Sequence, residues 1–139
     1  MIIHRYNPEK PKKETVFYIQ SHGLHAGRPL KEPIPNSWEM DTEIKNAFEI
    51  CFMVYNSKFL KNYLRGSVIP FLSLHEYKKI IQPLFKNPIQ HEETTLKKIK
   101  TLQLLDVAIQ KQEDTRKYYN ELKTAIAHEL LKSFHTKSH

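Results

Sequence analysis

The chain has 139 residues, a length typical of one domain, with 22 Lys and Arg against 15 Asp and Glu for a net charge of +7. Hydrophobic residues make up 40% and aromatic residues 11%, with only 3 Gly, which excludes a disordered chain. The most apolar stretch, residues 50–55, is too short to cross a bilayer, and no secretory leader is visible, so we expect a cytoplasmic protein that contacts no membrane.

The positive charge is spread along the chain, because each third carries a small excess of Lys and Arg. A mild, dispersed basicity permits DNA binding without requiring it. The single cysteine, Cys51, cannot form an internal disulfide, which suits a reducing compartment. Its apolar surroundings predict a buried structural thiol.

The first half of the chain predicts two strands and a helix. Residues 1–14 form a polar, proline-punctuated segment, and residues 15–21 (TVFYIQS) predict a strand. Residues 21–36 (SHGLHAGRPLKEPIPN) contain two Gly and three Pro, which predicts a rigid irregular loop, and NSWEM after it is a candidate second strand. Asp41 or Thr42 can cap a helix that runs from about Glu43 to Arg65 or Gly66.

The second half predicts two more helices. Residues 67–74 (SVIPFLSL) read as a short extended run, and Ser73 with Glu76 offers a capping box for the helix that follows. Pro83 and Pro88 are expected to break the chain. Residues 92–134 then contain no Gly and no Pro, which predicts a long helix, a coiled coil or a helical hairpin.

Two apolar stripes divide this long segment. The first comprises Leu96, Ile99, Leu102, Leu105 and Ile109, the second Tyr118, Tyr119, Leu122, Ile126, Leu130 and Phe134, with the polar residues 110–117 between them. Strict heptads do not persist, so we expect helix pairing with only local coiled-coil packing. The fold class predicted is α+β: a small sheet-containing head over residues 15–90 and a helical arm over 91–139.

The histidine pair His22 and His25 is the only metal-like spacing near a loop. A tetrahedral zinc site needs four ligands, and no Cys pair or acidic cluster supplies the others. We therefore predict no metal and no cofactor. The glycines of the same loop offer only a weak phosphate signal, because the P-loop spacing is missing. No nucleophile with an evident base is found, so we expect a protein that is not an enzyme.

Five basic residues are candidates for contact with DNA phosphates: Arg28, Lys31, Lys58, Lys61 and Arg65. The last three are spaced i, i+3 and i+7 near the end of the predicted helix. Cations at that position also complement the helix dipole, so this ordinary explanation stays open.

Residues 43–134 resemble part of a type I restriction–modification specificity subunit. The resemblance rests on Gly66, Ser67, Pro70 and Ser73, followed by Ile99, Leu102, Leu105, Asp106 and Ile109. It implies a reduced target-recognition domain followed by a spacer helix, with one of each where the full subunit has two. The whole chain also resembles small uncharacterised bacterial proteins that stand alone.

The resemblance implies a non-enzymatic module that contacts duplex DNA. Its long helix would mediate formation of a homodimer, burying the stripe Leu96, Ile99, Leu102, Leu105 and Ile109, or docking to a methyltransferase-like partner. The alternative is a protein-interaction or scaffold module that has lost DNA contact. A more distant possibility is a small enzyme that uses the loop of His22 and His25.

Overall fold

The computed structural model describes residues 1–137 and divides the chain into two compact units, Met1–Lys100 and a second that begins at Thr101. Residues 138–139 of the predicted arm lie outside the described part. We call the first unit the head. A four-stranded antiparallel sheet, two shorter α-helices and one long C-terminal helix confirm the α+β class.

The sheet of the head has the strand order β1-β4-β2-β3, with β1 at Ile2–Arg5, β2 at Val16–Gln20, β3 at Pro29–Leu30 and β4 at Ser37–Asp41. Antiparallel register places Met40 between Ile3 and Phe17, and Ile19 opposite Trp38. Since successive side chains in a strand alternate between faces, these residues share one face. All five are buried.

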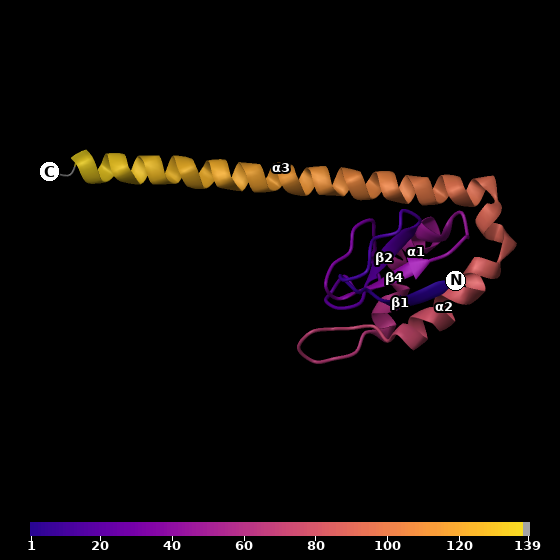
Figure 1. Ribbon diagram of the computed structural model, residues 1–139. Coiled ribbons are helices and arrows are strands. Elements are labelled where there is room, and N and C mark those ends of the chain that lie inside the picture. Colours follow the sequence, from indigo (N-terminus) through magenta and orange to yellow (C-terminus); the bar gives the residue numbers. More distant parts are fainter. Residues whose placement is uncertain (138–139) are drawn as a thin grey trace. The chain divides into compact units, whose positions relative to one another are not determined.

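Two helices, α1 at Ala47–Asn56 and α2 at Leu74–Lys86, lie with the sheet in the head (Figure 1). The ring of Trp38 packs 5.3 Å from that of Tyr77 on α2, and Phe17 packs 5.4 Å from Phe48 on α1, centroid to centroid. The core formed by sheet and helices also contains Ala26, Ala47, Ile50, Cys51, Val54, Leu60, Leu72, Ile81 and Phe85.

The first residues of the chain carry no predicted strand, yet β1 pairs along its whole length with β4. A polar pair supports this pairing, because His4 Nε2 lies 3.1 Å from Glu39 Oε2 and the two residues are directly opposite. On the same face Tyr6 packs edge-on against the fully buried Tyr18 at 5.6 Å. The N-terminal residues therefore form part of the sheet.

The loop predicted over residues 21–36 is not wholly irregular, because β3 lies inside it. Pro29 is tolerated since β3 is an edge strand, where one side of the backbone needs no partner. Gln20 and the loop exchange backbone hydrogen bonds: Gln20 N–H donates to Arg28 O at 3.0 Å, and Gly27 N–H donates to Gln20 O at 2.7 Å. The second predicted strand, β4, is confirmed.

The helix predicted from Glu43 to Arg65 or Gly66 is wrong in its length. It begins at Ala47, ends at Asn56, and is followed by a separate 3₁₀ helix, η1, at Phe59–Tyr63. Ser57 causes the break: its hydroxyl donates to Val54 O at 2.6 Å and accepts from Phe59 N–H at 3.2 Å. Such side-chain bonds compete with the helical backbone pattern, and Lys58 adopts a positive φ of 64°.

The helix predicted after Ser73 is confirmed as α2, and the Ser73 side chain accepts from Glu76 N–H as the capping box requires. Pro83 does not break the chain there, because α2 continues through it to Lys86. Pro88 begins the short helix η2, Pro88–His91. The predicted extended run 67–74 forms no strand; only Phe71 makes isolated bridges, with His22 and Arg65.

The long helix α3 spans Glu93–Lys137 without a break and includes the polar stretch 110–117 (Figure 1). Of the arrangements predicted for this segment, the single helix is the one found. Among the described residues, no helix combines the length and the apolar character that crossing a membrane demands.

Candidate functional site

Three of the five basic candidates have partners within the head. The Arg28 guanidinium donates to Gln20 Oε1 at 3.1 Å, and Lys31 Nζ lies 3.8 Å from the centre of the Phe48 ring. Arg65 forms an ion pair with Glu76 of α2. These contacts tie the three cations to β2, α1 and α2 and draw on the hydrogen-bonding capacity that a phosphate would use.

Lys58 and Lys61 differ from the other three. Both are exposed, and neither side chain has a hydrogen-bond or ion-pair partner in the described part of the chain. Lys58 is the N-cap residue of η1, with a φ of 64°, and Lys61 lies in the last turn of η1. They are the free part of the predicted basic surface.

His22 and His25 are held by different partners. Ser21 Oγ lies 2.7 Å from His22 Nδ1, whereas His25 Nδ1 lies 2.9 Å from the Tyr55 hydroxyl on α1. Across residues 1–137 no three His, Cys, Asp or Glu side chains are grouped to hold a metal ion. The two histidines thus serve separate hydrogen bonds that anchor the loop.

A polar cavity of about 690 Å³ opens in the head where the N-terminal end of α2 meets the ends of β1 and β2. Its polar lining includes Arg5, Ser21, His22, Asn36, Arg65 and Ser73. The contact of Ser21 with His22 differs from a catalytic triad, in which a carboxylate orients the histidine, and Ser21 is buried. The residues that line this cavity come from five separate segments, so no local pattern in the sequence predicts it.

Cys51 belongs to α1, and its thiol is fully buried in the core. Burial raises its pKa from 9.0 to about 12, and a hydrogen bond with Tyr77 opposes this shift. Burial likewise raises the pKa of Tyr77 well above 10.0. A thiol that stays protonated is a poor nucleophile, which agrees with the structural role predicted for Cys51.

The five residues of the stripe predicted for self-association differ in how deeply they are buried. Ile99 is only 3% exposed and belongs to the head, whereas Leu105 and Ile109 are 54% and 53% exposed; Leu96 and Leu102 are half-buried. Steps of three residues rotate the side-chain direction by about 60° each, since one residue turns the helix by about 100°. Ile99 and Leu105 therefore point in different directions and cannot face one partner together.

Beyond Lys100, α3 carries an unusual number of exposed large apolar side chains. They are Leu104, Leu105, Val107, Ile109, Tyr118, Tyr119, Leu122, Ile126, Leu130, Leu131 and Phe134. Isolated exposed apolar residues are ordinary on protein surfaces, but a contiguous set marks an interaction site. This set is the most pronounced apolar surface of the second unit.

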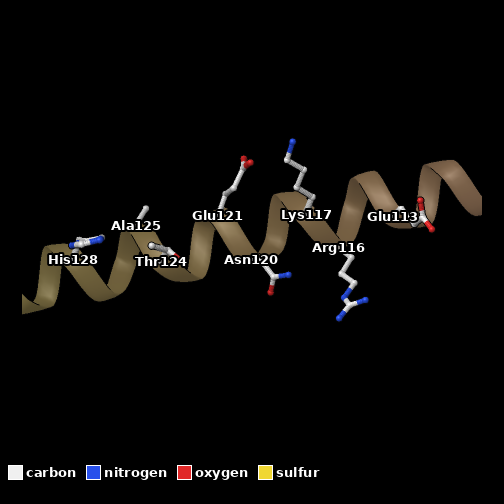
Figure 2. Close-up of a pocket in the computed structure, with 8 residues that line it drawn as sticks. All are labelled: Glu113, Arg116, Lys117, Asn120, Glu121, Thr124, Ala125 and His128. Carbon is white, nitrogen blue, oxygen red and sulfur yellow. The ribbon is translucent and has the colours of Figure 1, made fainter. Parts of the chain in front are cut away.

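A depression on α3 lies on the more polar side of the same helix (Figure 2). Figure 2 shows Lys117 and Glu121 on one side of the ribbon and Arg116 and Asn120 on the other. All the lining residues come from α3. Because one helix supplies only one wall, this feature is open surface and does not enclose a ligand.

Comparison with protein families places the chain in one of them. Residues 3–129 match the model of the Family of unknown function (DUF6943), and the chain belongs to that family. This agrees with the expectation of an uncharacterised family, and it carries no link to restriction–modification specificity subunits. No curated protein and no solved structure matches the chain.

Proposed function

We propose that this protein is a non-enzymatic module that self-associates through α3, with a second copy of the same chain as its partner. The observation that carries the proposal is the exposed apolar surface of residues 104–134. Transfer of a large apolar side chain out of water is worth roughly 1.5–3 kcal/mol when burial is complete. A helix with so many such side chains gains substantially by pairing.

The second unit supports the same proposal, because its described residues all belong to α3. In proteins a helix derives most of its stability from packing an apolar face against a neighbour. Beyond Lys100 the described residues supply no other helix or strand to this unit. A second copy supplies that neighbour.

The choice of a second copy rests on the order of side chains along the helix. Tyr118, Leu122, Ile126, Leu130 and Phe134 follow one another at intervals of four, and the series has an aromatic residue, a leucine, an isoleucine, a leucine and an aromatic residue. We call these five residues the α3 row. An interface between identical subunits must be self-complementary, and the α3 row has this property.

Sedimentation equilibrium tests the proposal with two variants that add the same charge. Ile126→Glu places a carboxylate in the middle of the α3 row, and Thr124→Glu places one on the opposite side of the helix. We expect the wild type and Thr124→Glu to form dimers and Ile126→Glu to associate at least tenfold more weakly. A wild type that stays monomeric at all concentrations, or an Ile126→Glu variant that dimerises normally, would overturn the proposal.

Contact with duplex DNA is a second proposal, favoured by the free and exposed Lys58 and Lys61. The net charge of +7 and the resemblance to a target-recognition domain support it. Lys58 caps the start of η1 and Lys61 lies in its last turn, and we propose two phosphates of one strand as their ligands.

Fluorescence anisotropy with a mixed-sequence duplex at several salt concentrations tests this second proposal. We expect affinity to fall steeply with salt, and Lys58→Ala/Lys61→Ala to reduce the slope of log K against log salt by about 2. Lys79→Ala/Lys86→Ala on α2 removes the same charge elsewhere and is the control. Absence of binding at low salt, or equal loss in both double variants, would contradict it.

A further inference from the structure

The order of residues along the α3 row bears on whether two copies of the helix pair parallel or antiparallel. Any sequence matches itself when two copies run parallel in register, so parallel pairing requires no symmetry in the sequence. By class of residue, the α3 row is symmetric about Ile126, with a leucine on either side and an aromatic residue, Tyr118 or Phe134, at each end. Antiparallel pairing about Ile126 therefore sets Leu122 beside the partner's Leu130, and Tyr118 beside the partner's Phe134.

We infer that two copies of this chain pair antiparallel, with their α3 helices crossing at Ile126. This inference rests on the proposed function and names the geometry of its interface. It leaves the head of each copy outside the contact that it describes.

The spacing of the row defines how the helices cross. Residues at intervals of four form a ridge inclined to the helix axis, and two such ridges pack side by side when the helices are inclined by about 50°. A coiled coil instead needs apolar residues at alternating intervals of three and four over several heptads. The α3 row has only intervals of four, so crossed packing fits it better than a long coiled coil.

The sizes of the side chains fit a crossing point at Ile126. Crossed helices diverge away from that point, and the larger rings of Tyr118 and Phe134 stand at the two ends of the row, where the gap is wider.

The exposure of the row shows that it is free to take a partner. The five side chains are between 45% and 74% exposed, with Phe134 the most exposed and Leu122 the least. The antiparallel arrangement also sets the two helix dipoles in opposition, which is the favourable orientation for neighbouring helices.

Disulfide cross-linking distinguishes the two directions. Ile126→Cys places a thiol at the crossing point itself, where it faces its counterpart in the partner. Ser133→Cys places thiols about 20 Å apart along the axis in the antiparallel dimer, since each residue adds 1.5 Å, but side by side in a parallel one. The native Cys51 is fully buried, and the wild-type protein is the control that shows how much cross-linking comes from Cys51.

We expect Ile126→Cys to form covalent dimers in a glutathione redox buffer and Ser133→Cys to form few, at least tenfold fewer at equal times. Cross-linking of Ser133→Cys at an equal or greater rate would overturn the antiparallel geometry. Failure of both variants to cross-link, in a protein that sediments as a dimer, would also overturn it and leave self-association standing. A monomeric wild type would remove both proposals.

Discussion

Gly27 and Leu60 meet so closely that a β-carbon on Gly27 would overlap Leu60 Cδ1, and Gly27 has a φ of +95°. The loop before β3 is thereby packed directly onto the residue that η1 contributes to the core. This contact joins a segment that the sequence predicts as a loop to one that it predicts as part of a helix.

Gly27→Ala is expected to destabilise the head by more than the backbone conformation alone explains. An L-residue in the left-handed region costs about 1–2 kcal/mol, and the overlap with Leu60 adds to that cost. Gly23→Ala is the matched control, because Gly23 has a φ of +92° but its added carbon would meet only Gln20 Nε2 at 3.4 Å. Urea unfolding measures the free energy of unfolding of both variants. An equal loss of stability in the two would show that the Leu60 side chain moves aside without cost and would contradict the prediction.

Ile99→Ala is expected to lower the free energy of unfolding by about 2–4 kcal/mol, because Ile99 is buried and its truncation leaves a cavity. Leu105→Ala, on the same helix but 54% exposed, is expected to change it by less than about 1 kcal/mol in the monomer. Chemical denaturation at low protein concentration compares them. Similar losses in the two variants would contradict the division of the predicted stripe.

Alkaline pH is expected to destabilise the protein through Cys51. Its pKa is about 12 in the folded chain against 9.0 ordinarily, so the unfolded thiol ionises first. The protonated thiol therefore stabilises the folded chain. This contribution is fully present below pH 9 and is lost as pH rises from 9 towards 12, at about 1.4 kcal/mol per pH unit.

Cys51→Ala should reduce this dependence, which urea unfolding between pH 8 and pH 11 measures. The slope against pH is the readout, since loss of the buried side chain lowers stability at every pH. Tyr77 contributes a further loss at higher pH, because its pKa is also raised by burial. An identical slope in the variant and the wild type would refute the role of Cys51.

Ser73→Ala is expected to lower the free energy of unfolding by about 1 kcal/mol, because the Ser73 hydroxyl accepts a hydrogen bond from the N–H of Glu76 at the start of α2. Ser67→Ala, in the exposed loop just before, is the control and should be nearly neutral. Thermal unfolding followed by circular dichroism measures both. If Ser73→Asp, which retains a capping oxygen, fails to preserve stability, the loss has another cause.

The sequence by itself determined the elements whose signals are local. Ser73 with Glu76 marks the start of α2, and the absence of Gly and Pro over residues 92–134 indicates that this segment is helical, whereas its continuity as one helix is found in the structure. β-branched and aromatic residues likewise specify β2. In each of these cases neighbouring residues alone supply the hydrogen bonds or the periodicity that stabilise the element.

Only the tertiary structure decided the features that depend on distant residues. Ile2–Arg5 became a strand because β4 pairs with it, and Ile99 was separated from Leu105 because only one of them is covered. The polar cavity of the head gathers residues from five segments, which no spacing in the sequence can reveal. Pairing and burial are set by which surfaces meet in space, and for the α3 row that surface is the one we assign to a second copy.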